Sequence, residues 1–324
     1  MDNIHRKAGN MENALQTTTA ATLTTAQAIT ETMYRQFIAF CDAKPQTIKA
    51  YTVALQNLFG YFRDHGITRP DTDDIIRYKG ELQAQYKPCT VSLYMTAARL
   101  FFRWTAQRGY FPNVADHVKG AKIDRNHKRD YLTAPQVKEV FSTADRDTLT
   151  GKRDFALLAL MTAAGLRDIE VARANIEDLR PAGADMALYI QGKGRDEKAD
   201  CVTIPAEVEK AIRDYLTARG ETDPTAPLFV SASNHGKGDR LTTRSISRIV
   251  KGHFTRAGFT SDRLTAHSLR HTAITLSLLA GRTIQEAQTF ARHADISTTQ
   301  IYAHNIEDMT AKSACGRAVA AAIF

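Results

Sequence analysis

Six polar side chains within or beside apolar helix patterns are the residues most suited to chemistry. An arginine guanidinium can hold two phosphate oxygens at once, whereas histidine and lysine can transfer protons. A tyrosine phenol can act as a nucleophile toward phosphorus. Together these residue types suit the breaking of a phosphodiester bond. The six residues are Arg167, Lys193, His267, Arg270, His293 and Tyr302.

The spacing of four of these residues predicts which of them lie together. His267 and Arg270 are three residues apart in the helical pattern TAHSLRHTAITL, so they share one helix face. His293 and Tyr302 are nine residues apart, on either side of a predicted break near residues 295–297.

Each residue taken alone also has a purely structural interpretation. An arginine after a glycine, such as Arg167, is commonly a surface cap, and a lysine at a turn, such as Lys193, is commonly solvated. His267 and His271 have the spacing of a metal-binding pair, but HSLRH lacks the carboxylate of the zincin motif. We therefore expect no metal ion, and only the combination of residues favours phosphodiester chemistry.

Hydrophobic periodicity predicts that the front part of the chain is a compact four-helix domain over residues 27–119. Residues 1–26 are polar and rich in threonine, which predicts a disordered tail. The four helical segments, joined by short loops, are residues 32–43, 45–66, 71–85 and 88–109.

Residues 131–324 are predicted to be mainly helical with one small β element. The segment MALYIQGKGRDEKADCVTIP, residues 186–205, predicts two antiparallel strands around a Gly-Lys-Gly turn. Thr133 is a predicted helix N-cap, and Gly165 is expected to end a strongly apolar helix. Residues 120–130 predict a linker, either plainly solvated or lying as a basic segment next to DNA.

Charge favours nucleic acid as the partner, because the formal net charge is +8 and the pI is about 9.3. Residues 1–130 carry 18 Lys and Arg against 12 Asp and Glu, whereas residues 131–324 carry 25 against 23. Hydrophobic residues make up 43% of the chain, enough for a folded core. Four scattered cysteines and the lack of a long apolar run predict a cytoplasmic protein without a membrane segment.

The motifs AGLRDIE, GKG, HSLRH and ARH, followed by Tyr302, occur in the order found in one family. In this order the chain resembles the tyrosine recombinase (phage integrase) family in its Xer-like two-domain form, over about residues 27–310. The resemblance implies a mainly α fold: an N-terminal four-helix core-binding domain and a C-terminal mixed helical catalytic domain with a small antiparallel β-sheet.

The resemblance also implies roles for the residues that match its motifs. Arg167 matches the first catalytic arginine, and Glu170, one turn later, matches an acidic residue that supports its orientation. His267 and Arg270 match the family's HxxR pair, and Tyr302 matches the nucleophile that forms a 3′-phosphotyrosyl link. From the phenol's ordinary pKa of about 10, we expect that it needs help to lose its proton, with His267 as the natural helper.

Two further positions complete the match. His293 matches the second histidine, and Lys193 matches the hairpin lysine that gives a proton to the departing 5′-oxygen, although Arg195 and Lys198 offer alternatives. Arg292 departs from the family, which commonly has glycine there and reads LGH, and Asp168 replaces a more usual small or apolar residue. Two arginines can replace the metal ions that many nucleases need, so no cofactor is expected.

The resemblance to the tyrosine recombinase family also implies partners. They are double-stranded DNA, three further copies of the chain in a homo-tetramer on synapsed DNA sites, and an accessory DNA-bending or directionality protein. The apolar terminal segment KSACGRAVAAAIF either docks on a neighbouring copy or packs on its own chain. Candidate phosphate contacts in the front domain are Lys44, Lys49, Lys87, Arg99 and Arg103.

Two other functions fit parts of this pattern. A type IB topoisomerase shares the tyrosine chemistry but relaxes supercoils alone, and the helical front domain favours the recombinase over it. A sequence-specific DNA-binding protein without chemistry is the second alternative, and the presence of all six chemical residues argues against it. The DNA site, and the choice between integration, excision, inversion and resolution, are not encoded in a readable way.

Overall fold

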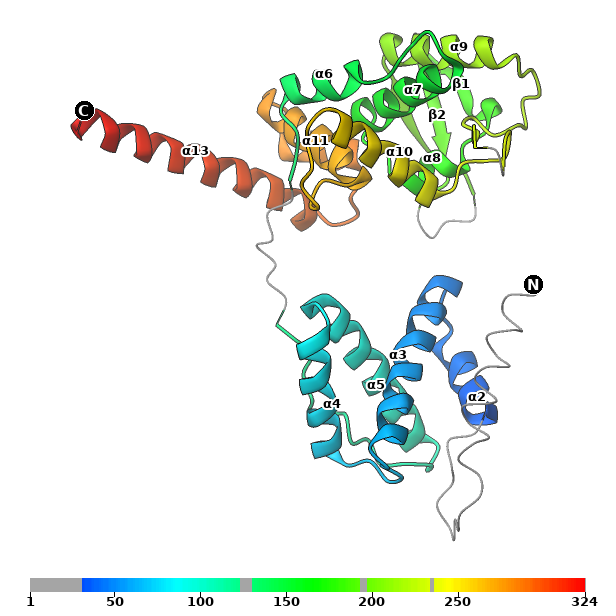
Figure 1. The fold of residues 1–324 in the computed structure, drawn as a ribbon, viewed down its shortest axis with the longest axis vertical. Coiled ribbons are helices and arrows are strands. Elements are labelled where there is room, and N and C mark those ends of the chain that lie inside the picture. The colour runs from blue at the N-terminus through cyan, green and yellow to red at the C-terminus, as the bar shows by residue number, and fades with distance from the viewer. Residues whose placement is uncertain (1–30, 123–129, 193–196, 234–235, 324) are drawn as a thin grey trace. The chain divides into compact units, whose positions relative to one another are not determined.

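A computed structural model describes residues 31–122, 130–192, 197–233 and 236–323 (Figure 1). The described residues fall into two compact units, one up to residue 122 and one from residue 130. The tail predicted over residues 1–26 and most of the linker predicted over residues 120–130 lie outside the described residues.

The N-terminal unit contains the four helices that the sequence predicts. Proline in the first turn begins α3 and α5, where its missing N–H leaves no partner unsatisfied. A capping box begins α4. The Asp71 side chain accepts from the Asp74 backbone N–H at 2.8 Å, and the Asp74 side chain accepts from the Asp71 backbone N–H at 2.9 Å. The helices are α2 (Glu31–Cys41), α3 (Pro45–Asp64), α4 (Thr72–Gln85) and α5 (Pro88–Gln107).

The core of this unit is aromatic. Phe37 of α2 lies edge-on to Phe101 and Trp104 of α5, with ring centroids 5.3 and 5.7 Å apart, and all three side chains are fully buried. Edge-to-face packing of this kind adds to the free energy that burial of the rings supplies. Helix packing around these rings therefore forms the core of the unit.

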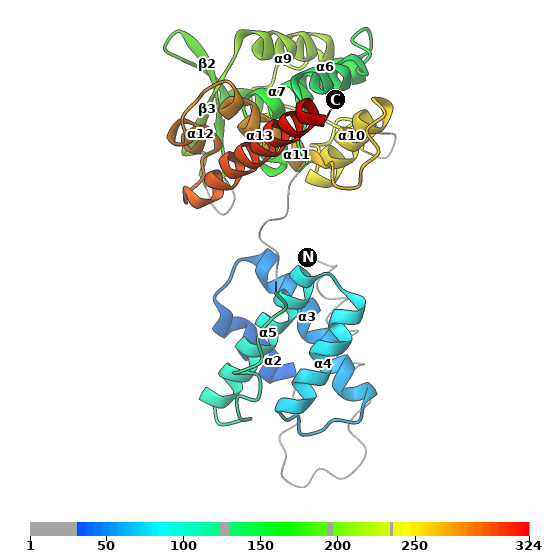
Figure 2. The same cartoon turned by 90° about the vertical axis from the view of Figure 1, so that its left-hand side faces the viewer.

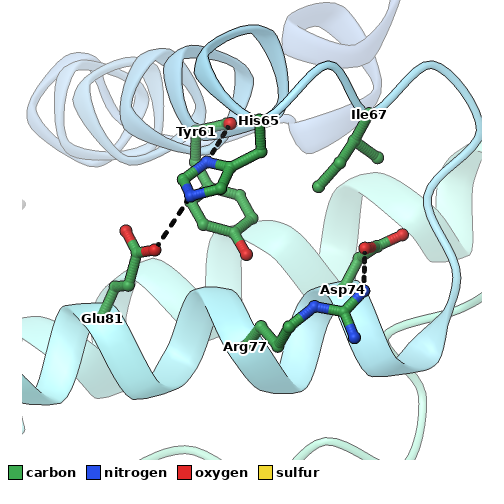
Figure 3. A pocket seen from close by; sticks show the side chains of 6 residues that line it. All are labelled: Tyr61, His65, Ile67, Asp74, Arg77 and Glu81. Atoms are coloured by element: carbon green, nitrogen blue, oxygen red, sulfur yellow. Dashed lines mark hydrogen bonds and ion pairs between the residues drawn. The ribbon is translucent and has the colours of Figure 1, made fainter.

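A surface pocket lies between the end of α3 and α4 (Figure 3). His65 contacts Glu81 through Nε2 at 3.2 Å, and Arg77 contacts Asp74 at 2.5 Å. Arg77 and Asp74 both belong to α4, whereas the contact of His65 with Glu81 joins the end of α3 to α4.

The C-terminal unit is mainly helical with a small sheet, which confirms the predicted fold class. Its helices are α6 (Ala134–Ser142), α7 (Leu149–Ala163), α8 (Asp168–Arg173), α9 (Ala206–Arg219), α10 (Thr243–Arg256), α11 (Ala266–Leu279), α12 (Ile284–Ala291) and α13 (Ser297–Ile323), with a short 3-10 turn η1 (Ile176–Asp178). The buried helix α7 packs against α9 and α11, and Thr133 precedes α6 as the predicted N-cap.

The sheet has three antiparallel strands in the order β1-β2-β3: β1 (Leu179–Ala182), β2 (Asp185–Ile190) and β3 (Asp200–Ile204). The last two strands are the predicted pair, with Leu188 opposite Val202. The first strand was not predicted, because its four residues LRPA include a proline and lack alternation. A proline in a strand suits the sheet edge that this strand occupies.

Helices α12 and α13 both contact α11 (Figure 2). Tyr302 lies on α13, and His293 lies in the short connection between the two helices. Thr299, near the start of α13, is fully buried, whereas residues 310–323 of the same helix are exposed throughout. The distal part of α13 extends away from its own unit (Figure 1).

Candidate active site

The first arginine is fixed by the helix that follows it. Arg167 is the N-cap of α8, and its backbone N–H donates to Glu170 Oε2 at 2.9 Å while its Nη1 donates to Glu170 Oε1 at 2.8 Å. The Glu170 side chain is 1% exposed and the Arg167 side chain is 25% exposed. The buried carboxylate therefore fixes the position of the arginine and leaves part of the guanidinium accessible to solvent.

The second arginine ties two segments of main chain together. Arg270 of α11 is buried, and its two Nη atoms donate to the carbonyl oxygens of Gly165 and Ala291. These residues lie two positions before Arg167 and two positions before His293. Burial, followed by the nearby charges of Arg167 and Arg292, lowers the pKa of Arg270 to about 10. The guanidinium stays charged at neutral pH.

Gly165 is required at this junction. Its φ is +56°, which ends α7 in a left-handed conformation, and a Cβ there would lie 3.1 Å from the ring of Phe290 in α12. The segment that leads into Arg167 therefore packs directly on α12.

Arg292, the departure from the family pattern, joins this cluster. It is the C-cap of α12 with φ +53°, and its Nη2 donates to Glu170 Oε2 at 2.8 Å. Burial alone raises the pKa of Glu170, but the charge of Arg292 and the hydrogen bonds from Arg167 outweigh it and lower that pKa below its ordinary value. Glu170 is therefore an ionised carboxylate between two arginines.

Tyr302 lies in the first turns of α13 and is 6% exposed. Its hydroxyl forms a hydrogen bond with Nδ1 of His271, and its ring lies almost parallel to that of His293, with centroids 6.3 Å apart. His293 Nδ1 is 2.9 Å from Thr299 Oγ1, so α13 also holds the second histidine. The tyrosine thus lies between two imidazole rings.

The structure places the predicted helper histidine differently. His267 is exposed, and its ring centroid is 6.5 Å from that of His271. The side chain that contacts the phenol is His271, which the sequence pattern suggested only as one member of a metal-binding pair with His267. The signal was present, because His271 lies one helical turn after His267 and next to Arg270.

Of the three candidate hairpin cations, only Lys198 lies within the described residues. Lys193 and Arg195 lie outside the described residues. Lys198 contacts Asp178 Oδ2 through Nζ at 2.5 Å, and Asp178 is 1% exposed. Because Lys198 holds a buried carboxylate beside the sheet, it is committed to the fold.

The candidate phosphate contacts of the N-terminal unit differ in exposure. Lys44, Lys49, Lys87 and Arg103 are exposed, whereas Arg99 is half-buried and donates to Thr96 Oγ1 at 3.3 Å. In the described ranges we find neither a group of acidic, histidine or cysteine side chains arranged for a metal ion nor a helix long and apolar enough to cross a membrane.

Comparisons with known proteins identify the family of the chain. Residues 130–308 match the model of the phage integrase family, and residues 34–109 match that of the phage integrase N-terminal SAM-like domain. The chain is 30% identical over 270 residues to the tyrosine recombinase XerC of Pelobacter propionicus, covering 81% of this chain and 86% of the relative. It is 29% identical over 273 residues to the tyrosine recombinase XerD of Listeria innocua, covering 80% and 87%.

A solved structure extends the agreement to the fold. The XerH site-specific recombinase, in a post-cleavage complex with palindromic difH substrate, superposes with a TM-score of 0.71 at 19% identity, covering 90% of each chain. The arrangement of arginines, histidines and tyrosine therefore lies on a fold shared with recombinases. The chain belongs to the phage integrase family, the family of the tyrosine recombinases.

Proposed function

We propose that this tyrosine recombinase breaks one strand of a specific DNA site with Tyr302 and rejoins it to another strand. The phenol oxygen attacks the scissile phosphorus, the bond to the 5′-oxygen breaks, and a 3′-phosphotyrosyl link forms. A 5′-hydroxyl from a partner strand then attacks the same phosphorus and releases the tyrosine. The observation that carries the proposal is the convergence of α8, α11, α12 and the start of α13 on one cluster of three arginines, two histidines and Tyr302.

The arginines would stabilise the charge that develops on the nonbridging oxygens. Arg167 is held by Glu170, and Arg270 is held by two main-chain carbonyls, so neither needs to reorganise when the transition state forms. The accessible part of Arg167 is the more direct phosphate contact. Arg270 would act from a buried position, where a charge is less screened by water than at the surface.

The proton transfers are assigned to the histidines and the hairpin lysine. His267 is exposed beside the cluster and remains our candidate to accept the phenol proton once DNA is bound. His293, stacked near the Tyr302 ring, would hold the phosphate or the phenol. Lys193 would protonate the departing 5′-oxygen, so that the leaving group departs as a neutral hydroxyl.

The N-terminal unit would grip the duplex through phosphate contacts. The exposed candidates for these contacts are Lys44, Lys49, Lys87 and Arg103, with Arg99 as a weaker candidate. Each phosphate neutralised by a lysine or arginine releases counterions, so affinity would fall linearly with salt on a double-logarithmic plot. Affinity that does not change with salt would contradict this part of the proposal.

We further propose that four copies assemble on two synapsed sites. The apolar end of α13 supports this, because Val319 and Ile323 are 57% and 68% exposed in the single chain. A structure of lambda integrase is a tetramer bound to a Holliday junction. Integration, excision, inversion or resolution of a mobile element in the cytoplasm, assisted by a DNA-bending or directionality protein, would fit such an assembly.

The proposal is tested with a suicide duplex, whose nick lets the cleaved fragment diffuse away and traps the protein on DNA. The duplex carries a site that the chain itself selects from a random-sequence library. The wild-type chain should form a covalent adduct, and Tyr302→Phe should bind the same duplex without forming one. Binding without any adduct by the wild-type chain would indicate a DNA-binding protein, and relaxation of plasmids without a specific site would indicate a topoisomerase.

A further inference from the structure

Arg292 occupies a backbone position that suits glycine better than arginine. Its φ is +53°, and among the described residues with side chains only Asp42 shares a positive φ. Residues other than glycine seldom adopt this conformation, because Cβ approaches the following carbonyl oxygen. A costly conformation that persists indicates that the side chain makes a compensating interaction.

That interaction divides the Glu170 carboxylate between two cations. Oε1 accepts from Arg167 Nη1 at 2.8 Å, whereas Oε2 accepts from Arg292 Nη2 at 2.8 Å and from the Arg167 backbone N–H. With Arg292 present, the three guanidinium groups and one carboxylate of the cluster carry a net charge of +2. Without it they would carry +1, because Arg167, Arg270 and Glu170 remain.

The Arg292 side chain is itself fixed in place. It is 13% exposed, and its two Nη atoms donate to Glu170 and to the Phe290 carbonyl oxygen, the latter at 3.1 Å. Its Nε is buried and has no hydrogen-bond partner within the part of the chain that the structure describes. A buried guanidinium acts on a nearby anion with less screening by water than an exposed one.

We infer that Arg292 is a positioning residue that holds Glu170 against Arg167 and raises the positive charge at the phosphate. This inference rests on the proposed function, since it assigns Arg292 to the same DNA site. Arg292 holds Oε2 of the carboxylate, while Oε1 accepts from the Arg167 guanidinium. In this way the first arginine keeps both its orientation and its charge toward the nonbridging oxygens.

The test compares two suicide duplexes that differ only at the scissile group. One carries the ordinary phosphodiester, and the other carries a methylphosphonate, which has lost the negative charge. Arg292→Gly removes the guanidinium and fits the left-handed backbone, so the fold is retained and the melting temperature serves as a check. Arg282→Ala is the matched control, because it removes an exposed arginine that precedes the same helix.

With the phosphodiester, Arg292→Gly should lower the rate of adduct formation roughly tenfold, as expected for one lost interaction with the transition-state charge. With the methylphosphonate the loss should be about twofold or less, and Arg292→Lys should recover part of the phosphodiester rate. Equal losses on both duplexes, no loss on either, or a lysine variant as slow as the glycine variant would overturn the inference.

A second measurement separates this inference from the proposed function. In the Tyr302→Phe chain, which cannot form an adduct, Arg292→Gly should weaken equilibrium binding to the phosphodiester duplex more than to the methylphosphonate duplex. If the wild-type chain forms no adduct, the proposed function fails, and this binding difference still decides the role of Arg292. Equal binding losses on the two duplexes would overturn that role.

Discussion

The two halves of the site are held in different ways. On the arginine side, buried Arg270 joins the segment before α8 to the end of α12 through two main-chain carbonyls. The buried Glu170 carboxylate adds ion pairs with Arg167 and Arg292. On the tyrosine side, Tyr302 lies near the start of α13, and its hydroxyl forms a hydrogen bond with His271 of α11. The far half of α13 is exposed. The proposed phosphate-binding half is thus preorganised within one chain. The proposed nucleophile depends on a helix of which only the first part packs on its own unit.

The largest expected effect comes from removing the residue that joins the two segments. Arg270→Lys keeps a positive charge, but one ammonium cannot reproduce the two-pronged contact with the Gly165 and Ala291 carbonyls. The rate of adduct formation should fall by roughly a hundredfold to a thousandfold, the range seen when one preorganised donor is removed. Single-turnover cleavage of the suicide duplex measures this fall. A lysine variant with near-normal rate would show that the buried fork is dispensable.

The next effect concerns the shared carboxylate. Glu170→Gln leaves Arg167 and Arg292 without their counter-charge, and breaking a buried pair in this way costs roughly 3 kcal/mol of stability. Thermal unfolding at neutral pH should therefore show a lower melting temperature, and cleavage should slow because Arg167 loses its anchor. Unchanged values for both would contradict the role of Glu170.

The same carboxylate predicts a pH dependence of stability. Because the pKa of Glu170 in the folded chain lies below its ordinary value of 4.5, its stabilising effect is fully present above that value. The effect is lost as the pH falls through the lower, folded-state pKa. The difference in melting temperature between the wild-type chain and Glu170→Gln should therefore be largest near neutral pH and shrink in acid. A difference that grows in acid would mean that Glu170 is not an ionised partner of the arginines.

A moderate effect is expected on the tyrosine side. His271→Ala removes the contact of the phenol, whereas His267→Ala removes the exposed histidine nearby. If His271 positions the phenol and His267 accepts its proton, both changes should slow cleavage about tenfold to a hundredfold, but only His267→Ala should remove the acidic limb of the pH–rate profile. The profile of each variant on the suicide duplex measures this division. If that limb disappears only in His271→Ala, the two roles are reversed.

The smallest effect on the single chain is expected at its end. Removing residues 312–324 takes away an exposed stretch of α13, so the melting temperature of the isolated chain should change little. The proposed assembly should be lost, because Val319 and Ile323 would no longer reach a neighbouring copy. Gel-shift analysis of synapsed duplexes measures assembly. Unchanged assembly would mean that this segment has no role between copies.

The sequence predicted the helices well because their signals are local. Apolar spacing, the prolines that begin α3 and α5, and the capping residues before α4 and α6 each act within one or two turns. Strand β1 escaped prediction because a four-residue edge strand with a proline is defined by its pairing with β2. Pairing depends on tertiary contacts that the local pattern does not contain.

The sequence named several residues that lie close together in the fold, but not all of their contacts. Family motifs named Arg167, Arg270, His293 and Tyr302, which the structure brings into one cluster. They did not name His271 as the partner of the phenol. Side-chain partners of this kind depend on how α11, α12 and α13 cross, which no spacing along one helix determines.

The sequence also did not predict that Arg292 pairs with Glu170. The departure from glycine was visible, but its hydrogen bond joins residues 122 positions apart. Long-range ion pairs of this kind follow from the way the chain folds and appear only once the fold is known.

Peptide mapping of the trapped adduct is the most direct test that Tyr302 becomes covalently joined to DNA. After digestion of both protein and DNA, mass spectrometry locates the residue that retains a nucleotide remnant. We expect a single modified peptide that contains Tyr302, with the nucleotide remnant joined through its 3′-phosphate. A remnant on another residue, or one joined through a 5′-phosphate, would contradict it.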